Sequence, residues 1–453
     1  MTTRRKFIKT GVALAAAGVP WGIARGNIAN IKYPGVWPSQ PPEGCPFAPS
    51  TTVRGFRFTG RHQQYANADT WYPSWASDGH LYSQFADGNA PRPGEGSIHV
   101  NCGMGIRADS GLARIDGDDP MHLKVEALGI SKASAMPYGG RYPCANLVYN
   151  GVWYTGTYCC DEGWRTEHGV SCNWAWLGPF VGFQYSRDFG KTWTPCPHTP
   201  WSPLFPEEVG NCGPALKKLA ATRWKLPVNQ WLGNVPGSAL CERIPGLPLP
   251  KFSVLHVVDF GRNMEHSPDG MAYMVGHGRA PGIPHPRLGA VSWLSGDAVY
   301  LARVKPTPET INNPGEYEFF AGYDHRHRPL WSKHFSHIKP MLEWQNHLGN
   351  SAMTYVPGLG KYILCIADGW PSTRKFNTIV LESAHPWGPW KLVTYMRHFG
   401  EQGYFVNIPS KFISSDGRKA WLCYSADFTR VRIASFPPGS GYHLCLQEIE
   451  LLG

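Results

Sequence analysis

The sequence predicts an all-β protein, and a β-propeller of five blades is the architecture that it favours. Only 17% of the 453 residues are charged, whereas the chain contains 51 Gly, 41 Pro and 19 Trp. Such a turn-rich and aromatic-rich composition favours many short strands over long helices. A recurring turn-and-strand pattern and one longer turn motif support the same fold class.

The recurring pattern is a Gly-containing turn followed by Tyr or Trp and an apolar strand. Asp-Gly and Asn-Gly in these turns supply the positive φ that tight hairpins need. The strands that follow are short and rich in β-branched and aromatic residues, which favours β structure. Copies of the pattern occur at residues 78–82, 150–154, 269–273, 296–300, 358–362 and 416–421.

The longer motif is at residues 186–193, which read Ser-Arg-Asp-Phe-Gly-Lys-Thr-Trp. This matches Ser-x-Asp-x-Gly-x-x-Trp, the Asp-box turn that is typical of sialidase-like β-propellers. In that turn the Ser and Asp side chains hold the hairpin backbone, and the Trp packs between sheets. Together with the repeated hairpins, the motif favours a propeller over the alternatives, a β-sandwich or a barrel.

The N-terminus has the layout of a twin-arginine export signal. Arg4 and Arg5 are followed by Lys-Phe-Ile-Lys, and an apolar run covers residues 11–24. That run is too short to span a bilayer, which takes roughly 20 apolar residues. We therefore expect the twin-arginine translocase to export a folded bacterial protein to the periplasm or beyond, without stable membrane insertion. Cleavage is expected between Ala24 and Ala29, and a retained tail is the alternative.

The rest of the chain divides into a lead-in and one domain. Residues 27–52 are Pro-rich and are expected to be extended, and residues 53–453 are expected to form a single propeller catalytic domain with a Cys- and Pro-rich insertion at about 197–250. The early strand at 53–58 is expected to close the ring by joining the last blade. The blades are predicted at about 69–107, 123–194, 252–304, 317–396 and 404–451.

Charge and cysteine content restrict the classes of partner. The formal net charge is +10, but five of these charges lie in residues 1–26, which hold no acid. The rest of the chain has a net charge of about +5 and contains no Lys/Arg run, so nucleic-acid binding is not expected. This mild positive charge is compatible with an acidic glycan as substrate. Twelve cysteines permit disulfides in an exported chain, and six of them between Cys144 and Cys212 suggest local stapling. Of the adjacent Cys159 and Cys160, one is expected to be buried and the other paired elsewhere, and a strained vicinal disulfide between them is the alternative.

Two carboxylates flank the first hairpin symmetrically. Asp69 and Asp87 lie nine residues either side of Asp78, so a turn at Asp78-Gly79 places them at the same end of the hairpin. Paired carboxylates at the mouth of a propeller axis suit glycoside hydrolysis, one as acid and the other as base or nucleophile. Trp71 and Trp75 nearby can stack on sugar rings. The alternative is that both Asp residues only cap turns.

These strings also carry a resemblance. Residues 69–88 resemble the opening hairpin of the five-bladed propeller family that includes endo-D-arabinanases, formerly a domain of unknown function. The resemblance covers most of residues 53–450 and implies a glycoside hydrolase in which two acids of the first blade act, here Asp69 and Asp87. The stretch 343–347 and the Cys-rich insertion depart from the family, which puts arabinan as substrate in question. Further similar strings are residues 317–322, 355–362, 386–390, 408–412 and 415–417.

A second set of residues suggests other chemistry. Propeller-shaped lyases abstract a proton beside a uronate carboxylate with Tyr or His, while Arg neutralises the carboxylate. A uronate lyase is therefore one alternative to the hydrolase, and a non-catalytic glycan-binding propeller is another. The substrate-binding set expected around the axis is Trp71, Trp75, Arg141, Arg262, His266, His347 and Lys411, and the lyase reading adds Tyr142 and Tyr149.

No catalytic metal or cofactor is expected. Residues 324–328 read Asp-His-Arg-His-Arg, and the interleaved Arg side chains would oppose a cation. A structural calcium ion in the propeller channel stays open, without assigned ligands.

Overall fold

The computed structural model describes residues 31–94, 96–136, 138–161, 165–167, 170–172, 176–207, 250–282, 292–369, 375–428 and 436–453. The chain divides into two compact units, Met1–Ile31 and Lys32–Gly453, and all described strands belong to the second. The predicted signal and most of the predicted insertion, including its expected short helix at 214–224, lie outside the described residues.

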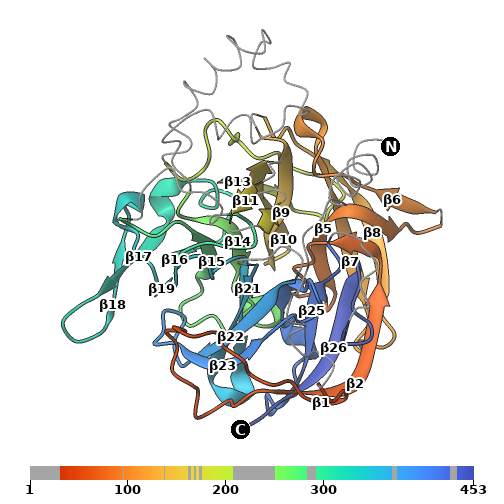
Figure 1. Cartoon of the computed structure of the whole chain (residues 1–453). Helices are drawn as coiled ribbons and strands as arrows, with labels where there is room; N and C mark the ends of the chain where they lie inside the picture. Colours follow the sequence, from red (N-terminus) through yellow and green to blue (C-terminus); the bar gives the residue numbers. More distant parts are fainter. Residues whose placement is uncertain are drawn as a thin grey trace. The chain divides into compact units, whose positions relative to one another are not determined.

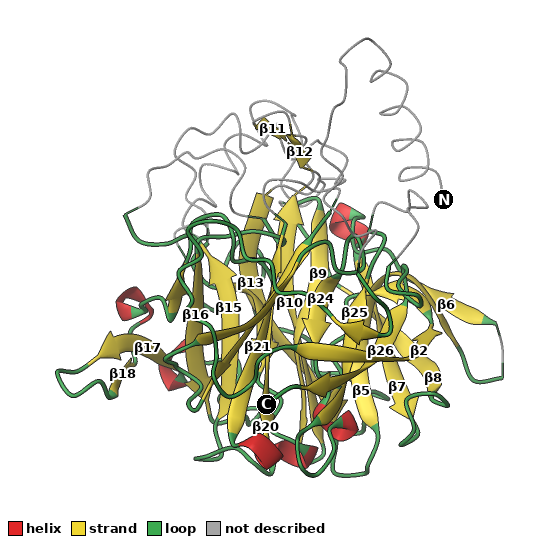
Figure 2. Ribbon diagram, turned by 60° about the horizontal axis from the view of Figure 1, so that its bottom comes forward, coloured by secondary structure: helices red, strands yellow, loops and turns green. Residues whose placement is uncertain are grey.

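The second unit is a five-bladed β-propeller, as the sequence predicts (Figure 1). Each blade is an antiparallel sheet whose innermost strand lies near the common axis. Strands β9, β14, β20 and β24 are the innermost strands of blades two to five, and β3 with β4 takes that place in blade one. Neighbouring inner strands contact one another, β9 with β14, β14 with β20 and β20 with β24. Helical residues occur only as short 3-10 pieces in the described chain (Figure 2).

The strands of the first two blades follow one another directly along the chain. Blade one consists of β3 (Asn67–Asp69), β4 (Ser74–Trp75), β5 (Leu81–Pro91), β6 (Ser97–His99), β7 (Asp109–Asp116) and β8 (Lys124–Lys132). Blade two consists of β9 (Gly140–Tyr149), β10 (Val152–Asp161) and β13 (Trp176–Ser186), and β11 (Arg165–Glu167) pairs with β12 (Val170–Cys172) as a separate ribbon.

The remaining blades include the sheet that both ends of the domain share. Blade three consists of β14 (Ser253–Val257), β15 (Ala272–Gly278), β16 (Ala298–Val304), β17 (Glu318–Tyr323), β18 (Pro329–Ser332) and β19 (Leu342–Glu343). Blade four consists of β20 (Ser351–Val356), β21 (Lys361–Asp368), β22 (Asn377–Ser383) and β23 (Lys391–Met396). Blade five consists of β24 (Tyr404–Asn407), β25 (Lys419–Ser425), β26 (Leu444–Leu451), β2 (Phe56–Tyr65) and β1 (Gly35–Val36).

The ring closes as expected, but two predicted blade boundaries are wrong. Strand β2 pairs with β26, which confirms the closing strand and extends it to Tyr65. Strand β8 pairs with β7 and is the outer strand of blade one, although the prediction opened blade two at residue 123. Likewise β17 pairs with β16 and extends blade three. The reason is that turn signals mark hairpins, and a hairpin within a blade has the same signals as a connection between blades.

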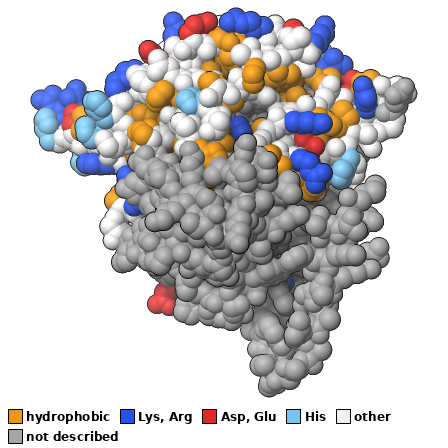
Figure 3. Space-filling view, turned by 90° about the horizontal axis from the view of Figure 1, so that it is seen from above, with side chains coloured by type: hydrophobic (Ala, Val, Ile, Leu, Met, Phe, Trp, Pro, Cys, Tyr) orange, Lys and Arg blue, Asp and Glu red, His pale blue; other side chains and the backbone are white. Residues whose placement is uncertain are grey.

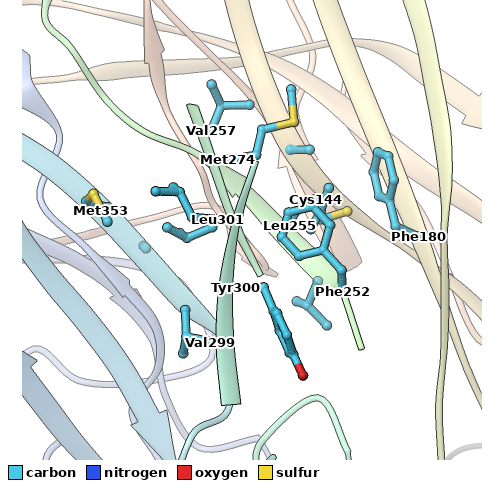
Figure 4. Close-up of a cluster of buried hydrophobic side chains, with 14 of the residues drawn as sticks. Cys144, Phe180, Phe252, Leu255, Val257, Met274, Val299, Tyr300, Leu301 and Met353 are labelled. Carbon is cyan, nitrogen blue, oxygen red and sulfur yellow. The ribbon is translucent and has the colours of Figure 1, made fainter. Parts of the chain in front are cut away.

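The core is built from apolar strand residues of several blades. Val299, Tyr300 and Leu301 of β16 have no exposed surface, and Leu255 of the same blade and Met353 of blade four are equally buried. Figure 4 shows Val299 and Leu301 on the side of Met353, and Tyr300 on the other side with Leu255 and Phe252. Large side chains buried this completely each contribute roughly 1.5–3 kcal/mol of burial free energy, so the blades hold together mainly through such contacts.

The recurring turn has a specific hydrogen-bond pattern. In two copies, the Asp accepts from the amide two residues later with one oxygen and from the Tyr hydroxyl four residues later with the other. Asp78 contacts the His80 amide (3.0 Å) and Tyr82 (2.7 Å). Asp269 contacts the Met271 amide (3.1 Å) and Tyr273 (2.9 Å). The Tyr after the turn is therefore part of the hairpin.

The Asp-box turn is formed as predicted. Asp188 Oδ1 accepts from the Ser186 hydroxyl (2.7 Å) and the Thr192 amide (2.8 Å), and Oδ2 accepts from the Thr192 hydroxyl (2.6 Å). Trp193 packs on Trp153 at 5.2 Å, in a cluster that includes residues of blades one and two. The Thr192 hydroxyl and amide, with the Ser186 hydroxyl, lower the pKa of Asp188 to about 2.

We predict that the Asp188→Ala variant is less stable than the wild type only where Asp188 is ionised. Because the folded pKa is depressed, the stabilisation is present above pH about 4 and is lost as the pH falls through about 2. Thermal melts of both proteins from pH 6 downward should show a difference in Tm that narrows below pH about 4. A difference that stays constant over this range would contradict the assignment.

The cysteines in the described residues do not support the expected stapling. Cys45, Cys102, Cys144, Cys196, Cys365, Cys423 and Cys445 are free thiols. Cys159 and Cys160 are both buried, although we expected one of them to pair elsewhere. Cys144 lies in the apolar core, where burial raises the pKa of its thiol well above the usual value. Cys212 and Cys241 lie outside the described residues.

The face of the molecule drawn in Figure 3 shows no single dominant charge feature among the described residues. Figure 3 shows Lys and Arg side chains scattered among hydrophobic and polar ones, without one continuous patch outside the grey atoms. This agrees with the absence of Lys/Arg runs in the sequence. No helix among the described residues has the length and apolar character needed to cross a bilayer.

Candidate functional site

The predicted carboxylates lie at one end of the propeller axis, which we name the upper end. It is the end at which the inner strands begin, at Gly140, Ser253, Ser351 and Tyr404. Asp69 ends β3 at this level, and Asp87 lies on β5 beside it, because Asp69 pairs with Ala86. The structure therefore brings Asp69 and Asp87 together at one end of the hairpin, as the sequence predicts. Their catalytic role stays a prediction at this point.

Asp69 is held by hydroxyl groups. Its Oδ2 accepts a 2.9 Å hydrogen bond from Tyr404 of blade five, and its Oδ1 accepts a 3.2 Å bond from the hydroxyl of Thr70. The Tyr404 ring packs edge-to-face on Trp293 at 5.3 Å, which fixes the position of the hydroxyl. Each carboxylate oxygen of Asp69 therefore has a hydroxyl donor, and these contacts hold the side chain in one orientation.

Asp87 is held by a main-chain amide and a tyrosine hydroxyl. Its Oδ1 accepts a 2.8 Å bond from the Cys102 amide, and its own carbonyl accepts a 3.0 Å bond from Tyr442. Only 5% of Asp87 is exposed, the same fraction as for Asp69. Burial raises the pKa of the Cys102 thiol well above its usual value, and the carboxylates of Asp87 and Asp69 raise it further. The two carboxylates therefore lie within electrostatic reach of one sulfur atom.

Unusual backbone geometry surrounds both residues. Asp87 (φ 48°) and Thr70 (φ 60°) are in the left-handed region, which is an outlier for the β-branched Thr70. The pairing of β3 with β5 is irregular between Asn67 and Asp69. At Gly88 a Cβ atom would lie 2.1 Å from the Asn67 carbonyl oxygen and 2.7 Å from the Ala68 Cα. Only glycine lets β3 approach this closely, so Gly88 determines where Asp69 lies.

Below the carboxylates the axis is filled by side chains. Tyr72 contacts His256 at 5.0 Å and Phe405 at 5.4 Å between ring centroids. Burial lowers the pKa of His256 to about 3, so this imidazole is neutral at physiological pH. The side chains of Tyr72 and His256 beneath the carboxylates are therefore uncharged.

We predict that Gly88→Ala displaces β3 and lowers both stability and any activity that depends on Asp69. The added methyl group meets backbone atoms, which cannot move aside as a flexible side chain can. We expect a lower Tm and a larger loss of activity than for Gly129→Ala, where the backbone has no positive φ and the Cβ meets nothing within 4 Å. Equal effects of the two substitutions on activity would contradict the role given to Gly88.

The two tryptophans differ from the expected sugar platforms in their placement. Trp71 is 1% exposed, stacks on Phe85 at 5.2 Å and donates its Nε1–H to the Ala68 carbonyl at 2.8 Å. A ring buried in this way presents no face to a ligand. Trp75 is half-buried and pairs with Leu81 next to the turn, at the opposite end of the hairpin.

Three further predicted residues lie together at the lower end of the axis. Arg262 donates to the Ser77 carbonyl, and Lys411 donates to the Gly79 carbonyl at 2.7 Å, so both hold the first hairpin turn. His266 lies in the same segment as Arg262 and contacts Glu265 at 3.8 Å. Leu81 and Asp87 are six residues apart on β5, a distance of about 20 Å. These three side chains therefore do not join the carboxylates, because the fold separates the two ends of each strand.

Arg141 and His347 are at the upper end. Arg141 is 8% exposed, and its guanidinium donates to the Thr157 hydroxyl (2.7 Å) and the Ser134 carbonyl (3.1 Å). His347 stacks on Trp344 at 4.1 Å, and its Nδ1 is 2.7 Å from Asp368. Both side chains are held firmly by their neighbours. The expected substrate-binding set is thus divided between the two ends of the axis.

Tyr404 and Cys102 contact the carboxylates, but neither residue was predicted from the sequence. Tyr404 is 335 positions from Asp69, and it reaches that residue only because blade five lies beside blade one. Cys102 contributes its amide, a group that every residue except proline has. The Gly at position 88, directly after Asp87, is a sequence signal for the close approach of β3 to β5 at this site.

The described residues contain no group of three His, Cys, Asp or Glu side chains arranged to hold a metal ion. Asp324 in the Asp-His-Arg-His-Arg stretch accepts instead from the Arg326 amide (2.8 Å), the Arg328 amide (2.9 Å) and the Arg328 guanidinium (2.8 Å). This stretch is a turn held by its own Asp.

No known protein family matches the sequence, and no curated protein is similar to it. Among solved structures, a family 117 glycoside hydrolase from Zobellia galactanivorans is similar with 12% identity and a TM-score of 0.41, over 89% of this chain and 90% of that chain. The GH43_1 enzyme from Xanthomonas citri, complexed with xylotriose, has 13% identity and a TM-score of 0.40, with 85% and 86% covered. The endo-arabinase from Bacteroides thetaiotaomicron VPI-5482 has 11% identity and a TM-score of 0.38, with 87% and 98% covered. At these identities and scores, the function has to be argued from the residues of this chain.

Proposed function

We propose that this protein is an exported glycoside hydrolase that cleaves a complex polysaccharide with Asp69 and Asp87. The observation that carries the proposal is the pairing of two nearly buried carboxylates at one end of a propeller axis, one of them held by hydroxyl donors. Paired carboxylates are the minimum that most glycoside hydrolases need. Export rests on the N-terminal sequence pattern alone.

The two carboxylates would take different roles. Asp69, whose two oxygens accept from Tyr404 and Thr70, would attack the anomeric carbon or activate a water molecule that does so. Asp87 would give a proton to the oxygen of the leaving sugar, so that the glycosidic bond breaks without releasing an alkoxide. Tyr72 and His256, which lie beneath the carboxylates, are uncharged and would place no competing charge near the glycosidic bond.

We predict that Asp69→Asn and Asp87→Asn each lower kcat by about 10²–10⁴-fold, because each removes a proton-transfer or nucleophilic group. The measurement is the release of reducing ends from arabinan, xylan and polygalacturonate by the mature chain. Asp78→Asn is the matched control, since it makes the same change at the lower end of the same hairpin. Full activity in a well-folded Asp69→Asn or Asp87→Asn protein would refute the assignment.

We predict that Tyr404→Phe lowers kcat by about 10–100-fold with little change in KM. A hydrogen bond to a charged group contributes about 1.5–3 kcal/mol, and Phe keeps the packing on Trp293. Because Tyr404 acts through Asp69, the pH profile of kcat should also move. Without the hydroxyl, the rise of kcat on the low-pH side, which reports the deprotonation of Asp69, shifts to higher pH. An unchanged profile would assign Tyr404 a packing role only.

The structure gives less support to the uronate lyase. The Arg262 and His266 pair, on which that hypothesis depends, lies at the lower end with Lys411, apart from Arg141 and Tyr142 at the upper end. The two chemistries are separated by recording ultraviolet absorbance during the assay of reducing ends, since only a lyase produces an unsaturated sugar.

A further inference from the structure

A cavity lies between blades one and two, and neither axial carboxylate lines it. Its volume is about 780 Å³, within the range of about 300–1,000 Å³ that small-molecule sites occupy. One wall is the end of β8 and the segment after it, residues 131–136, and the other is formed by β10, β13 and residues 195–201. The cavity therefore does not depend on Asp69 or Asp87.

The lining of this interblade pocket is basic. Arg141, Lys132 and His198 line it, and the described residues that line it include no Asp or Glu. The Arg141 guanidinium is buried, and it donates to two neutral groups, the Thr157 hydroxyl and the Ser134 carbonyl. A buried guanidinium with neutral partners favours an anion, because the guanidinium fork matches carboxylate geometry.

One polar group in the pocket wall has no hydrogen-bond partner among the described residues. The Thr155 hydroxyl is buried, with 1% of the residue exposed, and it lines the pocket. Leaving a buried hydroxyl without a partner costs roughly 1–3 kcal/mol, which a bound ligand would recover. Gln184 pairs with Thr155 across β10 and β13 and also lines the pocket. The pocket wall thus offers the Thr155 hydroxyl and the Gln184 amide in addition to the Arg141 guanidinium.

The other surfaces of the pocket are apolar or aromatic. Trp201, Met136 and Ile106 line it together with the basic and hydroxyl groups. A ligand with an anionic group, hydroxyl groups and apolar ring faces matches this combination, which a simple inorganic anion does not.

We infer that the interblade pocket binds a carboxylate-bearing sugar residue, with Arg141 as the partner of the carboxylate and Thr155 as the partner of a sugar hydroxyl. The pocket would hold an acidic unit of a glycan while the axial site acts elsewhere on it. Binding itself does not require the proposed hydrolysis.

The test uses digalacturonate as the probe and its neutral counterpart galactobiose as the comparison, with the mature chain and isothermal titration. We expect digalacturonate to bind at least 10-fold more tightly than galactobiose, and Arg141→Met to remove the difference. Inorganic phosphate is a third arm: if it competes as well as digalacturonate, the pocket is a general anion site and the inference is wrong. Equal binding of the two disaccharides would also overturn it.

Thr155→Val is the variant that separates binding from folding. Valine has the same shape but no hydroxyl, so the Tm should be unchanged or higher while the affinity for digalacturonate falls about 3–10-fold. Thr378→Val is the matched control, because Thr378 is likewise a buried hydroxyl without a partner among the described residues, but on β22. Unchanged affinity in Thr155→Val would remove Thr155 from the site.

Cys196 provides an independent readout of occupancy. This half-buried thiol lines the pocket, and burial raises its pKa while the backbone at His198 and the Arg141 charge lower it. Digalacturonate should slow alkylation of Cys196, located by mass spectrometry, and Asp69→Asn should show the same protection. Protection of Cys196 without hydrolysis would support ligand binding in the interblade pocket and contradict the proposed hydrolysis. Hydrolysis without protection would support the proposed hydrolysis and contradict ligand binding in this pocket.

Discussion

The pairing of β2 with β26 is the interaction on which the rest of the propeller depends. It places the N-terminal strand of the domain in the last blade, in a register that runs from Phe56 opposite Leu451 to Tyr65 opposite Leu444. Blade five is thereby held next to blade one. Three hydrogen bonds then join blade five and its connections to the candidate site: Tyr404 to Asp69 (2.9 Å), Asn407 to the Trp71 carbonyl (3.0 Å) and Tyr442 to the Asp87 carbonyl (3.0 Å). Opening the ring would remove all three.

A second constraint acts where the inner strands crowd around the axis. Thr70, Ala145, Val254 and Phe405 are each in the left-handed region, and each lies in or next to the inner strand of a different blade. Strand pairing is irregular at or near the same places in these four blades. Such irregularities bend a strand and redirect its side chains, and they are common next to functional sites. In blade one this geometry, together with Gly88, places Asp69 beside Asp87.

The sequence predicted the features that depend on local chemistry. Asp-Gly turns need positive φ, and the Asp-box residues bond within their own hairpin, so both could be read from a few neighbouring letters. The juxtaposition of Asp69 and Asp87 also followed from one hairpin. The blade partition, the burial of Trp71 and the contact of Tyr404 with Asp69 depend on which distant strands pack together. No short stretch of sequence contains that information. For the same reason, the prediction that Arg262 and Lys411 lie near the carboxylates was wrong.

The axial site and the interblade pocket are joined through one residue. The Cys102 amide donates to the Asp87 carboxylate at 2.8 Å, while the Cys102 carbonyl accepts from the Arg141 amide at 3.1 Å. Asp87 and Arg141 are therefore separated by the backbone of a single residue, although only Arg141 lines the interblade pocket. The proposed axial site and the interblade pocket thus depend on the same backbone unit, and a substitution at position 102 that moves this backbone would affect both.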